Sequence, residues 1–264
     1  MTSLARYLGR SMIDLTLDFL FKTRFMLEAL SSAHLVLPGR NRPIFTVFLK
    51  QIYFSGFQSA GIIFLVALAI GTVIITQIIE LVGSGNEPLI GQVLIWSVVR
   101  ELGPLLTALI VIARSGAAIA SELGTMKVGH EVETLELLGI RPEVYLVMPR
   151  IIGMILAVMA LTIYFELAAI LGGCLVASLG WQVSYERFAE GIYAALSLRE
   201  MMVSVIKSVL FGLMVGSACC GQGLSVGSSA TQVPQAATRG VLQSLFLVVV
   251  CDGVVTLLSL FLSR

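Results

Sequence analysis

Charged residues are scarce in this chain: 12% of its 264 residues are Asp, Glu, Lys or Arg, whereas 57% are hydrophobic. An ordinary soluble domain carries roughly twice that charged fraction, so water is not the main solvent of this protein. The net charge of +1 also leaves no basic surface of the kind that binds nucleic acid. The composition therefore predicts an integral membrane protein and excludes a nucleic-acid partner.

Catalytic and metal-binding motifs are also missing. The sequence has no G-x-x-x-x-G-K-[ST] phosphate loop, so the chain has no recognisable means of hydrolysing ATP. It has only two histidines, and His130-Glu131 lacks the second histidine of a zinc-protease helix. Its four cysteines form no C-x-x-C pair and fall in or beside apolar segments, which is typical of small core side chains. We therefore expect no metal and no cofactor on this chain.

Long apolar runs dominate what is present. A spanning helix needs roughly 20 mostly apolar residues, and the charge-free stretch from Gln51 to Ile79 exceeds that length. The same criterion predicts an all-α membrane protein whose transmembrane domain covers residues 44–264. We expect about five spans, at about 51–79, 89–113, 151–178, 201–219 and 241–262.

The N-terminal residues 1–43 have a different pattern. Charged residues recur every four positions from Arg6 to Lys22 among apolar ones, which predicts an amphipathic helix lying in the membrane interface. The alternative is a soluble helix packed on the rest of the protein. Interspersed charges argue against a cleavable signal peptide. Pro38, Gly39 and Pro43 break the pattern, and residues 44–57 form an elbow helix into the first span.

Lys and Arg residues indicate the orientation of the chain. They accumulate on the cytoplasmic side of membranes, and seven occur in the first fifty residues, whereas the connection 80–97 has none. The connection 114–150 has four. With five spans, this distribution predicts a cytoplasmic N-terminus and a C-terminus on the opposite side of the membrane.

Four of the expected spans contain charges, which cost several kcal/mol at mid-bilayer unless they face protein or water. These charges either line a polar pathway or pair with one another as structural contacts. For Glu166 and Asp252 the sequence favours neither interpretation over the other. A pathway is favoured for Arg100 and Glu101, because Pro104 predicts a kink at that pair. The candidate cavity residues are Arg100, Glu101, Pro104, Lys207 and Asp252.

The segment 122–143 is unusually polar for a connection between two spans and longer than such a connection needs. Val128, Val132, Leu135 and Leu138 recur at helical spacing, which predicts a short amphipathic helix with an apolar stripe flanked by acids. Such a helix is suited to docking a soluble partner; the alternative is a solvated connector. The candidate docking residues are Glu122, Lys127, Glu131, Glu133, Thr134, Glu136 and Leu138.

Several runs of the sequence closely resemble the MlaE-type (YrbE-type) permease family, the membrane subunits of lipid-transporting ABC systems. The longest is R-E-L-G-P-L-L-T-A-L-I-V-I-A-R-S-G-A-A-I-A-S-E-L-G-T-M-K-V, from Arg100 to Val128. The chain departs from the family pattern at Ser228 to Pro234. Further matching runs are residues 51–59, 133–140, 147–150, 206–209 and 237–241.

The resemblance implies a function and a set of partners. It implies a homodimeric permease that moves glycerophospholipids between the inner membrane and a periplasmic MCE-type carrier, in support of outer-membrane lipid asymmetry. A separate cytoplasmic subunit would bind ATP and Mg and would dock on the coupling segment 122–143. Two other classes remain open from the residues: a lipid-modifying membrane enzyme using Glu166 or Asp252, and a channel.

Overall fold

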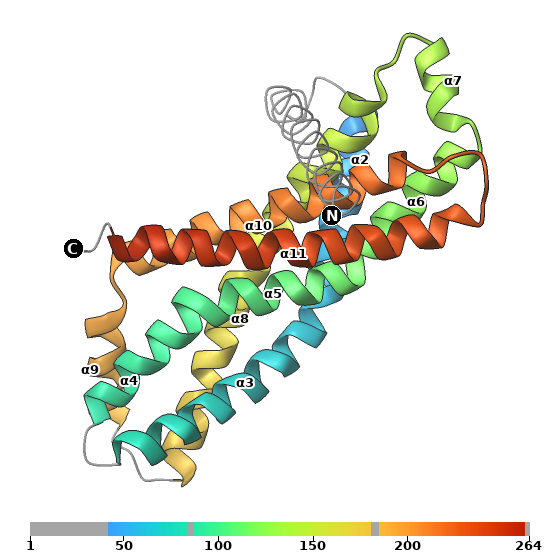
Figure 1. The fold of residues 1–264 in the computed structure, drawn as a ribbon. Helices are drawn as coiled ribbons and strands as arrows, with labels where there is room; N and C mark the ends of the chain where they lie inside the picture. The colour runs from blue at the N-terminus through green and yellow to red at the C-terminus, as the bar shows by residue number, and fades with distance from the viewer. Residues whose placement is uncertain (1–41, 84–86, 181–184, 262–264) are drawn as a thin grey trace, which may run out of the picture.

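The computed structural model describes residues 42–83, 87–180 and 185–261, and every regular element in those ranges is a helix (Figure 1). The expectation of an all-α membrane protein with five spans is confirmed. The interfacial helix predicted at residues 1–43 lies almost wholly outside the described residues. The five candidate spans are Ile44–Val82, Pro88–Val128, Glu143–Leu179, Leu198–Leu224 and Gln232–Phe261.

Each of the first three spans contains a π-helical stretch that interrupts or begins its α-helix. The first span comprises α2 (Arg42–Ile52), the π-helical Tyr53–Phe57 and α3 (Gln58–Val82). The second comprises α4 (Glu87–Ile95), the π-helical Trp96–Leu102, α5 (Gly103–Val111), the π-helical Ile112–Gly116 and α6 (Ala117–Val128). The third begins with the π-helical Glu143–Val147 and continues as α8 (Met148–Gly180). The remaining helices are α7 (Glu131–Leu137), α9 (Tyr185–Ala195), α10 (Leu198–Leu224) and α11 (Gln232–Phe261).

Each of the five spans is longer than the apolar segment from which it was predicted. Hydropathy reports only the part of a helix that lies in hydrocarbon, whereas backbone hydrogen bonds extend the helix into the headgroup region. Gly221 and Gly223 lie within α10, near its C-terminal end. A Cβ at Gly223 would lie 2.8 Å from the Ala120 carbonyl oxygen, so glycine is needed there for close helix packing and not for a turn.

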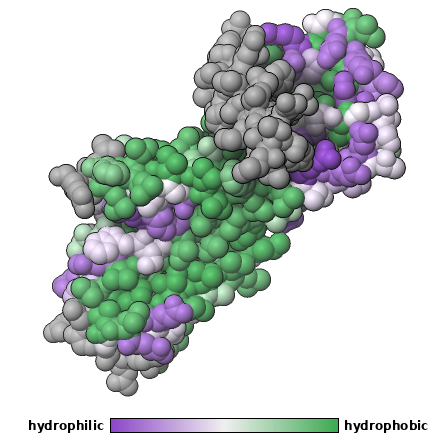
Figure 2. Space-filling view, viewed as in Figure 1, coloured by the Kyte–Doolittle hydropathy of each residue, from purple (hydrophilic) through white to green (hydrophobic). Residues whose placement is uncertain are grey.

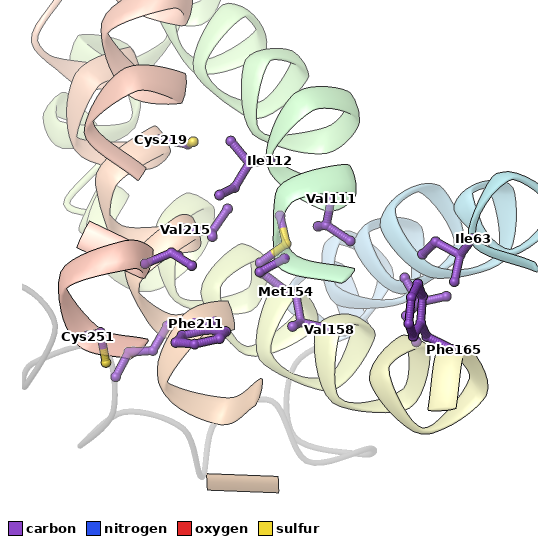
Figure 3. Packing of buried hydrophobic residues seen from close by; sticks show 14 of the residues in the cluster. Ile63, Val111, Ile112, Met154, Val158, Phe165, Phe211, Val215, Cys219 and Cys251 are labelled. Carbon is purple, nitrogen blue, oxygen red and sulfur yellow. The ribbon is translucent and has the colours of Figure 1, made fainter. Parts of the chain in front are cut away.

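Helix α8 lies at the centre of the bundle and contacts α2, α3, α5 and α10. Fully buried side chains from different spans meet along it, as Figure 3 shows for Ile63 of α3 and Phe165 of α8. Small residues allow the closest approaches: a Cβ at Gly71 of α3 would lie 2.0 Å from the Ala169 carbonyl oxygen. Such packing holds helices together in lipid, where apolar burial alone gives little advantage.

The bundle has two distinct ends, named here the α7 end and the α9 end. At the α7 end, α7 projects beyond the spans, and at the other α9 packs against α4 (Figure 1). Hydrophobic residues cover the middle of the face seen in Figure 2, and hydrophilic residues gather around α7. Because consecutive spans run in opposite directions, residues far apart in sequence meet at one depth.

Candidate functional site

The charged residues that the sequence places inside four of the expected spans lie at nearly the same level, about one third of the way in from the α9 end: Arg100, Glu101, Glu166, Lys207 and Asp252. Arg100, Glu101 and Lys207 lie in the first half of the second and fourth spans. Glu166 and Asp252 lie in the second half of the third and fifth spans. The helices pack so that most of these side chains touch. The polar cluster is defined as Arg100, Glu101, Glu200, Lys207, Asp252, Thr256 and Ser259.

Lys207 is the centre of the polar cluster, and its side chain is fully buried. Its ammonium donates hydrogen bonds to Glu101 Oε2 at 2.7 Å, Thr256 Oγ1 at 2.8 Å and the Arg100 carbonyl oxygen at 3.1 Å. These bonds use all three of its protons. Asp252 Oδ1 lies 2.8 Å away as an ion pair and receives no hydrogen bond with suitable geometry. Lys207 therefore joins three spans through both charge and hydrogen bonds.

Pro104 explains why the Arg100 carbonyl oxygen accepts a side-chain proton. A proline has no N–H to donate to the carbonyl four residues before it, which here is that of Arg100. The predicted distortion is present as the π-helical stretch Trp96–Leu102, after which α5 begins at Gly103 with Pro104 in its first turn. The proline is therefore tolerated as a helix start, while the carbonyl before it is available to Lys207.

Arg100 lies toward the α9 end of the cluster, with its side chain 20% exposed. Its Nη2 donates to Ser259 Oγ at 2.9 Å, and it forms longer ion pairs with Glu101 and Glu200, at 3.6 and 3.7 Å. Glu101 is 33% exposed and also accepts a hydrogen bond from Thr256. The outer part of the cluster is thus open to the surface, whereas Lys207 is closed off.

Glu200 is a cluster member that the sequence did not reveal. It stands in the first turn of α10, where Ser197 caps the helix by accepting a hydrogen bond from the Glu200 N–H. The predicted span began one residue later, so the acid was assigned to a connection. An acidic residue three positions after a serine is a helix-start signal that could have extended the span.

Glu166 lies beside the cluster and not within its ion pairs. It accepts a hydrogen bond from Ser204 Oγ at 2.5 Å, and its side chain packs on Gly103. Asp252, in contrast, is paired with Lys207. Glu166 and Asp252, for which both interpretations were open, therefore differ in their partners. Asp252 forms an ion pair with Lys207, and Glu166 is hydrogen-bonded to a serine.

The predicted coupling segment is not one helix, and this expectation is corrected. Gly129 and His130 separate α6 from α7, because His130 adopts a left-handed conformation with φ of 59° that ends the helix. Val132 is buried, but Leu138 follows the end of α7 and is 70% exposed. The stripe that looked continuous in sequence is therefore split between two helices.

Side-chain contacts fix the turn between α6 and α7. His130 Nδ1 lies 2.5 Å from Glu133 Oε2, Lys127 Nζ lies 3.4 Å from Glu133 Oε1, and Thr134 Oγ1 donates to the His130 carbonyl oxygen. The His130 hydrogen bond, aided by Lys127, lowers the pKa of Glu133 below its ordinary value. Glu131 and Glu136 are exposed and make none of these contacts.

Glu122, the first candidate of the segment, lies in α6 and pairs with Arg150 at the start of α8, with Nη2 and Oε1 2.8 Å apart. At the end of α7, Leu137 and Leu138 are large and exposed. The α7 end therefore presents an apolar tip flanked by acids, held to the bundle by short polar contacts.

The fold and the polar cluster together define a multi-pass helical membrane protein with charged groups inside its bundle, an arrangement found in transport proteins. The family described as "Permease MlaE" matches residues 48–258, which is most of the chain. The chain belongs to the MlaE permease family.

Curated relatives agree with this family. A "Probable ABC transporter permease protein" of Rickettsia typhi is 30% identical over 214 residues, covering 80% of this chain and 82% of the relative. A protein of Synechocystis with the same description is 30% identical over 205 residues, covering 77% and 78% of the two chains. The chloroplastic protein TRIGALACTOSYLDIACYLGLYCEROL 1 of Arabidopsis thaliana is 30% identical over 209 residues, covering 79% of this chain and 60% of that protein.

Proposed function

We propose that this chain is the permease subunit of an ATP-driven phospholipid transporter in a bacterial inner membrane. It would move glycerophospholipids between that membrane and a periplasmic MCE-domain carrier, and so support outer-membrane lipid asymmetry. The family match and the names of its relatives, one of which includes a diacylglycerol lipid, support a lipid cargo. The single observation that carries the proposal is a polar cluster at membrane depth that is partly open to the surface.

The polar cluster suits a lipid headgroup better than it suits an ion. Arg100 is partly exposed, and a guanidinium binds phosphate through two parallel hydrogen bonds. Around it the spans are apolar, which suits acyl chains. The buried ion pair of Lys207 with Asp252 would keep the helices in register, while Arg100 and the exposed part of Glu101 meet the lipid.

A second copy of the chain would complete the site. Helix α11 supplies Asp252, Thr256 and Ser259 to the cluster, yet it is the least buried span: 17% of its most apolar window is buried, against 67% for α10. Its outer face includes Phe246, Val250 and Leu257, all exposed. Two copies meeting along α11 would cover this face and would hold the lipid between them.

The two ends of the bundle would bind different partners. The α7 end would face the cytoplasm, as the Lys and Arg distribution indicates, and would receive the ATPase subunit that binds ATP and Mg. Its exposed leucines and acids support a docking role. The α9 end and the C-terminus would face the periplasm and the MCE-domain carrier.

Transport by the reconstituted complex tests this function. Because a hydrogen bond to a charged group contributes about 1.5–3 kcal/mol, Arg100→Ala or Glu101→Ala should reduce lipid transfer from liposomes about tenfold or more, while dimer assembly survives. Arg199→Ala is the matched control, since Arg199 is exposed and donates to the backbone carbonyl oxygen of Ser259 rather than to a cluster side chain. Wild-type transfer by both cluster variants would contradict the proposal.

A further inference from the structure

A second site lies at the α7 end, far along the spans from the polar cluster. It is a cavity of about 880 Å³ between α2, α6 and the start of the third span. This volume is in the range of cavities that hold small organic ligands. Its wall is mainly apolar, with Phe54, Ile119 and Met126 among the lining residues, and its charged lining residues are Lys50, Glu122 and Arg150.

Arg150 is the most unusual residue of this cavity. Its side chain is only 5% exposed, and its Nη2 is paired with Glu122. Its Nη1 is buried and has no hydrogen-bond partner among the described residues. A buried guanidinium donor without an acceptor is costly, and in folded proteins such a donor is usually satisfied by a protein group, an ion or ordered water. The cavity therefore lacks one acceptor beside Arg150.

The missing acceptor should be anionic. Lys50 and Arg150 carry two positive charges against the single negative charge of Glu122, so the cavity lining has a net charge of +1. Glu122 is mostly exposed, and water weakens its hold on Arg150. Lys50 is exposed at the rim, where it can reach the same anion as Arg150.

The cavity lies at the level of lipid headgroups. The second span has 41 residues and the third has 37, so each helix is about 55–60 Å long against a hydrocarbon core of about 30 Å. Glu122 and Arg150 stand within two turns of the ends of these helices. The exposed rings of Tyr53 and Phe54 lie on the side from which an acyl chain would enter.

We propose that this cavity binds an anionic glycerophospholipid as a bound structural lipid, distinct from the transported cargo. Its phosphate pairs with the guanidinium of Arg150 and with Lys50, and the first part of an acyl chain packs on Phe54, Ile119 and Met126. Because Arg150 already joins α6 to α8, the lipid fastens both helices to α2. This site does not depend on the role proposed for the polar cluster.

Thermal unfolding of the full chain in neutral detergent tests the site. Mixed micelles containing phosphatidylglycerol should raise the Tm by several degrees in a concentration-dependent way, because a ligand that binds only the folded state stabilises it. Phosphatidylcholine and inorganic phosphate at equal concentration should raise it much less. An equal shift with either of these probes, or none with phosphatidylglycerol, would overturn the proposal.

Two cavity variants and one control make the test specific. Arg150→Lys and Lys50→Gln should each raise the apparent Kd for phosphatidylglycerol about tenfold, as loss of a charge-assisted contact predicts. Lys50 is exposed, so its variant should fold normally even if the Arg150 variant does not. Arg141→Gln removes an exposed positive charge that does not line the cavity, and it should leave this affinity unchanged. Unchanged affinity in Lys50→Gln would count against the site.

A photo-crosslinking residue at Met126 identifies the occupant directly. Cross-links to phosphatidylglycerol in the full chain would support the proposal. Cross-links to residues 1–41 or to a second copy, without lipid, would show a protein occupant and would overturn it. Transport assays on Arg100 variants report separately on the proposed cargo site.

Discussion

Charged side chains are stabilised differently at the two ends of the bundle. Near the α9 end, Lys207 is fully buried and satisfied by partners from two other spans. At the α7 end, Glu133 is half exposed and interacts with residues three and six positions away. Buried charges depend on one another for their free energy, whereas exposed charges are compensated by water. The same substitution should therefore have very different effects at the two ends.

The largest effect is expected at Lys207. Lys207→Met leaves Glu101 and Asp252 without their shared cation, and breaking a buried ion pair destabilises a protein by about 3–5 kcal/mol. Unfolding of the detergent-solubilised protein by denaturant measures this loss. Lys127→Met is the control at the α7 end, where a single ion pair of 3.4 Å should contribute about 1 kcal/mol or less.

A double variant sharpens this prediction. Lys207→Met combined with Asp252→Asn removes one of the two acids left unpaired, so part of the lost free energy of unfolding should return. If the single variant at Lys207 were as stable as the wild type, the ion pairs of the cluster would have no structural role, and the comparison between the two ends would fail.

An intermediate effect is expected on partner binding at the α7 end. Reversing the charge of Glu131, Glu133 and Glu136 to Lys should weaken co-purification of the ATPase subunit about tenfold, because like charges across an interface slow association and weaken binding. The transmembrane bundle should still fold, since these side chains are at least partly exposed and lie outside the spans. Glu186→Lys with Glu190→Lys, at the α9 end, is the matched control. Unchanged ATPase recovery would exclude docking through these acids.

The smallest effect concerns pH. The hydrogen bond from His130 lowers the folded-state pKa of Glu133 below its ordinary 4.5, so the contact stabilises α7 fully above that pH. The stabilisation is lost as the pH falls through the lowered pKa, where the carboxylate becomes protonated. Hydrogen exchange of α7 amides should therefore accelerate below pH 4.5 in the wild type, beyond the intrinsic pH effect. Glu133→Gln should lack this step, and an identical pH profile would contradict it.

The sequence predicted the architecture well and the site only in part. Uninterrupted hydropathy over 20 or more residues requires a spanning helix, so five spans could be counted directly. Pro104 predicted a distorted helix at Arg100, because a proline removes a backbone hydrogen-bond donor whatever the tertiary structure around it. The break at His130 could not be predicted in the same way, because a left-handed residue other than glycine leaves little trace in composition.

The sequence by itself therefore determined local properties. These are whether each segment lies in lipid or in water, whether it is helical, and which charged residues lie inside a membrane span. Tertiary structure alone decided which charges meet. Glu101 and Lys207 are 106 residues apart and pair because their helices are parallel, in register and rotated toward each other. Arg150 is buried for the same kind of reason, since the neighbours that cover it come from α2 and α6. Rotation and register depend on packing between helices, and no single segment encodes them.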